Sequence, residues 1–477
     1  MIEGADQNTA RIGNALDSYD LRFEEVSDFN QNPGGIEFDA ATKRGYYGAT
    51  SFSNGGVSNV PMFRVPLLPA ASLGDLIPAN LVVSSNLPRV THAFGNSHAH
   101  PLIPSAAVNR TAPAGSTGQL LDHSYLLNDA LWDSTFFSTV ATFTNPLVTP
   151  IKRGALLTGF FNGTTRLLNP RFMPLLDTTG TAAQQAEKLD KLDDTKLSQQ
   201  VAGSMAIQGP FNVNSDSVAA WQAMLSSLRN ADLRGWGMTD LSPKDKTGFP
   251  RNGLPIAGDS ENPGAKPGID LSGQLRWAGF RALSETQIEL LAQKIVEQIR
   301  ARGIVDKAPS LSLAEFVNRR IGPASELQTV TGLLQTAIRE TNLNAKFYAL
   351  DSWDLATRPV ANAKALTGMV NPEARNGQSA DGAPSTLTQG DLLMALAPVI
   401  TVRGDTFRIR AYGESRTQQG TVTATAMCEA VVQRIPAFLD PAESASLKQA
   451  DLKQAANLRF GRRLIITSFR WLSPTES

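Results

Sequence analysis

Apolar residues recur at helical spacing through residues 283–345. Twice in this stretch a Ser stands three residues before a Gln or Glu, which is the capping-box pattern of a helix start. The pattern predicts helices joined by short loops, a compact insert of the helix-hairpin-helix or SAM-like kind. The predicted helices cover about 284–303, 313–320 and 325–340, with caps at Ser284–Gln287 and Ser312–Glu315 and a stop at Gly303. The first helix has a buried stripe at Ile288, Leu291, Ile295 and Ile299, and the third carries the apolar residues Leu327, Val330, Leu334 and Ile338.

The hydropathy pattern changes to a period of two after a last predicted helix, which Thr388 and Asp391 cap and Pro398 ends. The alternation predicts an antiparallel sheet with strands at 406–412, 421–434 and 463–471. Helices followed by such a sheet make the fold class α+β. We expect the helices before Pro398 to pack on the sheet and to bury Phe407. The buried face is predicted to hold Phe407, Ile409, Ala411, Val422, Ala424, Ala426 and Cys428, and the opposite face Arg408, Arg410, Thr421, Thr423 and Thr425.

The first half of the chain has weaker periodicity. Its opening region is cut by Pro and by Gly-Asn-Ser clusters, which is typical of short strands and extended loops. Helical spacing follows at 122–142 behind Asp122, at 181–205, and in a short helix that Asn214, Ser215 and Asp216 cap. The predicted regions are an irregular, β-rich 1–120, a helical 121–234, a Gly- and Pro-rich linker or surface loop 235–282, the helical insert 283–345 and a C-terminal α+β domain 385–477.

Composition narrows the class of protein. A chain of 477 residues has room for two to four domains. Its 44 basic and 44 acidic residues give no net charge, which argues against a nucleic-acid binder or an electrostatic membrane binder. Cys428 is the only cysteine, which excludes a disulfide framework. The sequence has no run of 18 apolar residues that would predict a membrane-spanning segment, so we expect any signal or anchor to lie upstream of Met1, if the chain is a fragment, or to be absent.

Five long strings are informative as a set. They are GNSHAHPLIP (95–104), DHSYLLNDALWDSTFFST (122–139), QVAGSMAIQGPFNVNSDSVAAWQAMLSSL (200–228), LSLAEFVNRR (311–320) and STLTQGDLLMALAPVITVRGDTFRIRAYGE (385–414). Together and in this order they resemble the Verru_Chthon cassette protein A family. Its gene cassettes also encode small proteins with prepilin-like N-terminal segments, and its full-length members begin with an apolar segment. The resemblance implies an extracytoplasmic envelope protein whose partners are the prepilin-like proteins of the same cassette.

A second, local resemblance covers residues 284–434. A capped helix with the string SLAEFVN, a strand with alternating arginines and a return strand ending in VVQR are together similar to the minor pseudopilin K of type II secretion. The resemblance implies a pseudopilin-like C-terminal domain and a role in envelope assembly. The calcium-binding residues of that protein have no matching Asp and Glu cluster here.

The best metal candidate is the pair His98 and His100, because residues two apart in a strand project from one face. His92, or His123 beside Asp122, could complete a tetrahedral site. The competing interpretation is a loop whose histidines bond backbone or solvent. We favour the loop, since a structural zinc site normally shows all four ligands. The prediction is therefore no metal site, with His98, His100 and His123 as the alternative.

Other chemistry has less support. No G-x-S-x-G elbow exposes a serine nucleophile, and no Gly-rich phosphate motif is present. The acidic residues of 190–194 are interleaved with lysines, which is typical of a solvated helix face. Arg408 and Arg410 are expected to blunt a sheet edge rather than to bind an anion. Cys428 is expected to be a small buried apolar residue.

We therefore expect a non-catalytic structural or assembly component of a pseudopilus-like envelope system, without cofactor or nucleic-acid partner, that acts through protein–protein contacts. The first alternative is a metal-dependent surface hydrolase that uses His98, His100 and His123. The second is a carbohydrate-binding module, whose candidate aromatic residues are Trp132, Trp221, Trp236, Trp277, Trp353 and Trp471.

Overall fold

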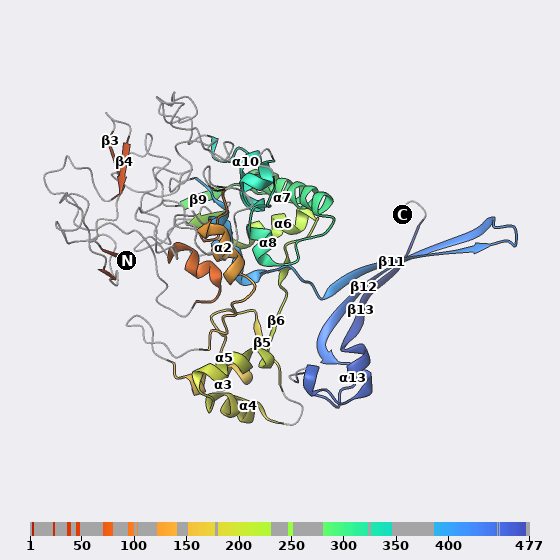
Figure 1. Ribbon diagram of the computed structural model, residues 1–477. Coiled ribbons are helices and arrows are strands. Elements are labelled where there is room, and N and C mark those ends of the chain that lie inside the picture. The colour runs from red at the N-terminus through yellow and green to blue at the C-terminus, as the bar shows by residue number, and fades with distance from the viewer. Residues whose placement is uncertain are drawn as a thin grey trace, which may run out of the picture. The chain divides into compact units, whose positions relative to one another are not determined.

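The computed structural model combines helices with a C-terminal antiparallel sheet of three strands, so the predicted α+β class is confirmed (Figure 1). The chain forms two compact units, each from two separated stretches: unit 1 from Met1–Phe136 and Val213–Pro398, unit 2 from Phe137–Asn212 and Val399–Ser477. The structure describes residues 2–3, 22–23, 36–39, 44–47, 70–79, 94–99, 103, 122–140, 151–176, 180–229, 247–250, 280–322, 326–345, 386–445, 447 and 449–473.

The centre of unit 1 is the long helix α7 (Glu285–Asp306). Its predicted cap is confirmed, because the Ser284 amide donates to Gln287 Oε1 at 2.9 Å and the Gln287 amide donates to Ser284 Oγ at 3.4 Å. The predicted stop at Gly303 is wrong. A glycine inside a helix costs only about 1 kcal/mol, and the helix ends at Lys307, whose φ of 54° is left-handed. The core-facing residues Ile288, Leu291, Ala292 and Ile295 are completely buried.

Two shorter helices, α6 (Val218–Leu225) and α10 (Leu333–Glu340), pack against α7. Trp221 of α6 is completely buried and stacks on Phe316, with ring centroids 6.2 Å apart. The cap of α6 is Ser217 rather than the three residues before it. The core of unit 1 therefore lies along α7 and is made of aromatic and aliphatic side chains.

Several predicted helices are shorter than their apolar patterns or are split. The predicted helix 325–340 breaks at Gly332, where a Cβ atom would collide with the Val317 carbonyl oxygen. The predicted helix 181–205 breaks before Asp193, whose carboxylate accepts from the Lys196 amide at 2.8 Å and caps a new helix. The observed helices are α2 (His123–Leu131) for 122–142, α4 (Ala182–Asp190), α5 (Asp194–Gln200) and the 3-10 turn Val201–Ser204 for 181–205, α8 (Leu313–Val317) for 313–320, and α9 (Leu327–Val330) with α10 for 325–340.

Gln389, the first residue of α12 (Gln389–Leu396), joins distant segments of unit 1. Its side-chain nitrogen donates to the carbonyl oxygens of Gly95 at 3.0 Å and Val317 at 2.7 Å. Its backbone amide donates to Gln335 Oε1 at 2.9 Å, and its Oε1 accepts from the Gln335 amide at 3.2 Å. Gln389 is completely buried. A buried amide is tolerated here because its polar atoms are bonded.

The first stretch of unit 2 is a small helical body. α3 (Arg153–Phe161) packs against α4, and β5 (Phe172–Pro174) pairs antiparallel with β6 (Met205–Ile207). Arg153 binds Asp190 at 3.0 Å and Asp194 at 2.7 Å, so part of the acidic cluster forms ion pairs. The core of this body is Leu156, Leu157, Phe160, Phe161, Leu167, Leu189, Leu197 and Val201.

The second stretch of unit 2 holds the sheet. β11 (Thr406–Arg416) pairs with β12 (Val422–Phe438), and β12 pairs with β13 (Arg462–Leu472), all antiparallel. The three strands form a long twisted ribbon, with the helix α13 (Ala455–Phe460) between β12 and β13 (Figure 1). The predicted strands 406–412, 421–434 and 463–471 are therefore confirmed, and β11 and β12 are longer than predicted.

The remaining elements are short. β8 (Thr247–Pro250) pairs antiparallel with β9 (Phe280–Leu283). β8 lies inside the stretch 235–282 that was predicted as a Gly- and Pro-rich linker or surface loop, and β9 lies at the end of that stretch. β7 (Phe211–Asn212) pairs parallel with β10 (Ile400–Thr401) and so joins the two stretches of unit 2. The others are β1 (Ile2–Glu3), β2 (Arg22–Phe23), β3 (Ile36–Asp39), β4 (Arg44–Tyr47) and the 3-10 helices Leu73–Ala79, Ser226–Leu228, Ala397–Val399 and Gln449–Asp451.

Candidate interaction surface

The three-stranded sheet has one apolar and one polar face. Residues directly opposite each other in an antiparallel pair project from the same face. Phe407 lies opposite Val432, and Ala430 lies opposite both Ile409 and Phe469, so the predicted alternation in β11 is confirmed and extends over all three strands. The apolar face comprises Phe407, Ile409, Ala411, Gly413 and Ser415 of β11, Ala424, Ala426, Cys428, Ala430 and Val432 of β12, and Leu464, Ile466, Phe469 and Trp471 of β13.

The apolar face is exposed, so the prediction that it is buried is wrong for Phe407, Ile409, Ala411, Ala424 and Ala426, and Cys428 is only half-buried. Val422 was predicted on this face but lies opposite Arg416 after a register shift. Phe407 is 43% exposed, Phe469 53% and Trp471 69%. An aromatic side chain carries 150–250 Å², so these three leave about 300 Å² uncovered. Ile409, Leu464 and Ile466 are each more than half exposed and bring the total to roughly 500 Å². A patch of this size on a single chain usually marks an interaction site.

Side-chain size varies regularly across the apolar face. The middle strand, β12, carries short side chains on this face, among them Ala424, Ala426 and Ala430. The flanking strands carry long side chains, such as Phe407 on one side and Trp471 on the other. An elongated partner can therefore approach the backbone of β12 closely and be contacted from both sides.

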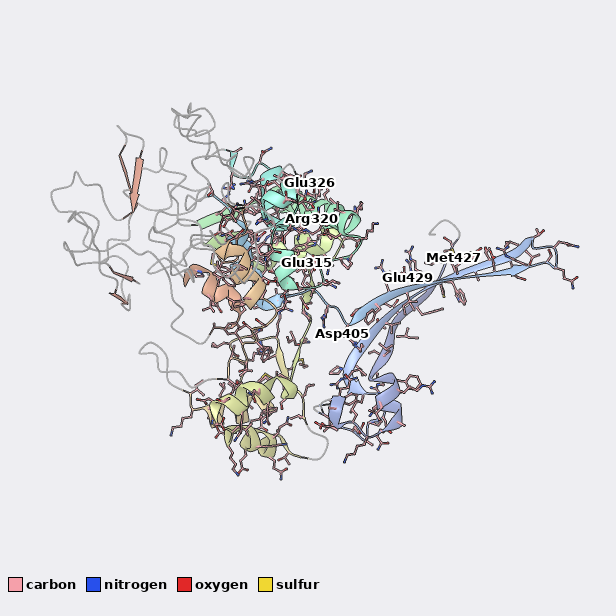
Figure 2. The ribbon with its side chains drawn as sticks, viewed as in Figure 1. Glu315, Arg320, Glu326, Asp405, Met427 and Glu429 are labelled. Atoms are coloured by element: carbon pink, nitrogen blue, oxygen red, sulfur yellow. The ribbon has the colours of Figure 1, made fainter. Side chains whose placement is uncertain are left out.

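The polar face is organised around Glu429 of β12, which is only 6% exposed (Figure 2). Its Oε2 accepts from Arg410 Nε at 2.8 Å, and its Oε1 accepts from Arg470 Nε at 3.2 Å. Arg408 Nε lies 3.9 Å from Oε2. The hydrogen bond from Arg410, followed by the one from Arg470, holds the pKa of Glu429 below its ordinary value. Arg408, Arg410, Arg470 and Glu429 are called the arginine cluster below.

A polar surface pocket of about 240 Å³ lies in unit 1 between α2, α8 and the end of α7. Arg302 lines it and donates to the carbonyl oxygens of Glu315 at 2.8 Å and Asn318 at 3.2 Å. Burial lowers the pKa of Arg302 to about 10. Arg320 binds Asp306 at 2.8 Å in the same wall. Three arginines and three acidic residues line this pocket, so it presents no net charge to a ligand.

Of the four histidines considered for a metal site, His98 is the one whose side chain the structure describes. His98 is half-buried and forms an isolated antiparallel bridge with Thr331. Asp122, which could have completed a metal site, caps α2 through Tyr125 N at 3.0 Å and binds Arg319 at 2.9 Å. The side chains of His92, His100 and His123 lie outside the described residues. Among the residues that are described, no group of three or more His, Cys, Asp or Glu could hold a metal ion.

The other candidate residues are dispersed. Trp132 is buried, stacks on Phe94 with centroids 5.7 Å apart, and donates to Asn128 Oδ1 at 3.2 Å. Trp221 is buried, whereas Trp471 lies on the apolar face. Cys428 lies on the same face and is half-buried. Trp236, Trp277 and Trp353 lie outside the described residues.

The sequence pattern locates the apolar face but does not by itself bring the residues of the arginine cluster together. Arg410 and Glu429 meet because of the strand register, and the length of the turn between β11 and β12 sets that register. A charge alternating with apolar residues on two neighbouring predicted strands is the one sequence signal that points to such a pair. The pocket lining comes from three separate segments and has no local signal.

Within the described parts of the chain, the helices are either too short or too polar to cross a membrane. Comparison with family models, with curated proteins and with solved structures gives no match to this chain.

Proposed function

We propose that this chain is a non-catalytic assembly component that acts through protein–protein contacts, and that the apolar face is a contact surface. The observation that supports this most directly is the exposure of Phe407, Phe469 and Trp471 on one face of a sheet. Covering roughly 500 Å² corresponds to about 12 kcal/mol before the costs of association. With a matching area on the partner, the contact reaches about 1,000 Å², the lower range of specific interfaces.

The proposed occupant is an apolar α-helix of a partner protein. Three strands at about 4.8 Å spacing span roughly 10 Å, which is close to the width of a helix with its side chains. The β11 positions on this face run from Phe407 to Ser415 and end in the small residues Gly413 and Ser415; they span roughly 26 Å, which is matched by about 18 helical residues. The positions of this face from Phe407 to Ser415 are uncharged, and Arg434, opposite Leu464 at one end of the face, is paired with Asp405, so the partner surface must be apolar along this length.

A second copy of this chain fits the same face less well. Two copies related by a two-fold axis would pack short central side chains against each other. The flanking Phe407 and Trp471 would then hold the sheets apart and leave a void over Ala426 and Ala430. Voids forfeit dispersion contacts and are avoided in packed interfaces.

The family resemblance supports a specific source for the helix. The related cassettes encode proteins with prepilin-like N-terminal segments, and such a segment is an apolar helix of suitable length. We therefore propose that the chain works in the cell envelope with the prepilin-like proteins of its own cassette. The alternatives of a hydrolase or a carbohydrate-binding module gain no specific observation that favours them.

The proposal is tested by co-purification of the chain with one prepilin-like protein of the cassette. Ile466→Asp places a charge on the apolar face, and Ser468→Asp places the same charge on the polar face of the same strand. We expect Ile466→Asp to reduce the recovered partner at least tenfold and Ser468→Asp to leave it unchanged, because burying an unpaired charge is costly. Equal recovery with both variants, or self-association of the chain through Ile466 instead, would overturn the proposal.

A further inference from the structure

The arginine cluster carries more positive charge than its own carboxylate neutralises. Arg408 and Arg410 share the carboxylate of Glu429, so these three side chains together have a net charge of +1. Within the part of the chain that the structure describes, Glu429 is the one acidic side chain within 4 Å of the Arg408 and Arg410 guanidinium nitrogens. The guanidinium-bearing side chains of Arg408, Arg410 and Arg470 remain 68%, 48% and 51% exposed.

The buried carboxylate of Glu429 holds Arg410 and Arg470 in place through hydrogen bonds, whereas Arg408 Nε lies 3.9 Å away. Arginine presents five N–H donors in a planar fork. In Arg410 the donor bonded to Glu429 is Nε, so both terminal nitrogens are without an acceptor among the described residues. A side chain that is already ordered loses less conformational entropy when it binds a ligand. The cluster therefore offers ordered guanidinium donors at Arg410 and Arg470, as expected for a receptor of planar oxyanions.

We propose that the arginine cluster binds the carboxylates of an acidic segment of a partner protein. This site lies on the face opposite the apolar face and does not depend on what covers that face. A polyanion such as nucleic acid or an anionic membrane needs a broad positive field. The chain has no net charge, and Arg416 on the same strand is already paired with Glu414. Local recognition of a few carboxylates is consistent with both facts.

The spacing of the cluster suggests the form of the acidic segment. Arg408 and Arg410 are two residues apart on one strand, which is roughly 6.6 Å. Alternate residues of an extended peptide have the same spacing. A segment with Asp or Glu at every second position can therefore place successive carboxylates against successive arginines. A helical segment has a different rise and matches this spacing poorly.

The test uses the full chain and a fluorescent peptide with glutamate at alternate positions, followed by anisotropy at low salt. We expect binding that Arg410→Gln weakens about fivefold, the effect of losing one strong exposed ion pair. Arg416→Gln is the matched control, because it makes the same change on the same strand outside the cluster, and it should leave the affinity unchanged. Arg410→Lys should behave like Arg410→Gln, because lysine keeps the charge and loses the planar fork.

Several results would overturn the proposal. One is the absence of binding at millimolar peptide, or equal binding of a peptide with glutamine in place of glutamate. Another is equal loss with the Arg410 and Arg416 variants, which would indicate non-specific attraction. A third is binding, through the same arginines, to vesicles with 30% phosphatidylserine but not to the peptide. Thermal unfolding of each variant shows whether a loss of binding comes from misfolding. We expect the Arg410 variants to stay folded, because this side chain is half-exposed.

Discussion

Arg319 and Asp122 form a buried ion pair in unit 1, with Arg319 Nη2 2.9 Å from Asp122 Oδ2. The Arg319 side chain is 0% exposed and that of Asp122 is 6% exposed. Asp122 also caps α2, and the Arg319 guanidinium lies over the Tyr125 ring at 5.5 Å. One contact therefore ties the start of α2 to the segment that follows α8.

Breaking this pair should be costly. Asp122→Asn leaves a guanidinium buried without its counter-charge, which typically costs about 3–5 kcal/mol. Urea unfolding should show this loss in the free energy of unfolding. The control is Glu297→Gln, which removes an exposed ion pair with Lys294 on α7 and should have no measurable effect. A variant of Asp122 as stable as wild type would mean that the pair contributes nothing.

The start of α8 has two sets of caps, so a single loss should be mild. Ser312 Oγ accepts from the Glu315 amide at 3.1 Å, whereas Asp133 accepts from the Leu313 and Ala314 amides, both at 2.9 Å. We expect Ser312→Ala to cost about 0.5–1 kcal/mol and Asp133→Ala about 1–2 kcal/mol. Equilibrium denaturation of both variants gives the order. If Ser312→Ala is the more damaging change, Asp133 is not the main cap.

Loss of the Phe407 ring should destabilise the fold only slightly. The side chain is 43% exposed, so Phe407→Ala should cost about 1 kcal/mol, roughly half the transfer free energy of a buried ring. Phe160→Ala, in the core of the helical body of unit 2, should cost about 3–5 kcal/mol. Both values come from denaturant titration. A loss of several kcal/mol for Phe407→Ala would show that the apolar face is covered in the isolated chain.

The stability of the sheet should depend on the ionisation of Glu429. Its pKa in the folded chain lies below the ordinary value of 4.5, so the ionised form stabilises the fold above pH 4.5. As the pH falls below 4.5, the unfolded chain takes up the proton first and the stabilisation is lost. Unfolding free energies measured from pH 7 to pH 3 should therefore fall less steeply in Glu429→Gln than in wild type. Parallel curves would contradict the ion-pair assignment.

The double variant His98→Ala with His100→Ala should keep its fold and its partner binding. The backbone on both sides of His98 is held by its neighbours: the Ala99 amide donates to the Val330 carbonyl oxygen at 2.7 Å, and the Ser97 carbonyl oxygen accepts from the Gly332 amide at 2.9 Å. Metal analysis of the purified wild type provides the check. Stoichiometric zinc that disappears in the double variant would establish a metal site at these histidines.

Local features were predictable from the sequence, and features set by distant partners were not. The caps at Ser284, Ser312 and Thr388 depend on residues three positions away, and all three mark the start of observed helices. The end of a helix depends on its surroundings. Gly332 interrupts a continuous apolar pattern because the Val317 carbonyl lies too close for a Cβ atom, a contact that no local pattern contains.

The same distinction applies to the sheet. Alternation in β11 correctly assigned Phe407 and Arg408 to opposite faces, because side-chain direction is a property of the strand itself. Whether a face is buried depends on what lies over it, and the prediction for Phe407 was wrong for that reason. The approach of Arg470 to Glu429 depends on a register that includes a bulge near Val431.

The interleaving of the two units constrains the order of events during synthesis. β7 ends the first stretch of unit 2, and its partner β10 begins the second, with residues 213–398 of unit 1 between them. A ribosome adding 5–20 residues per second needs roughly 10–40 s to make that interval. During this time the helical body around α3 has emerged while β7 still has no strand to pair with. Closure of so long a chain segment costs roughly 5 kcal/mol if it stays flexible. Prior folding of the intervening helices shortens the effective loop and reduces that cost. We therefore expect unit 1 to fold before β7 pairs with β10 and unit 2 is completed.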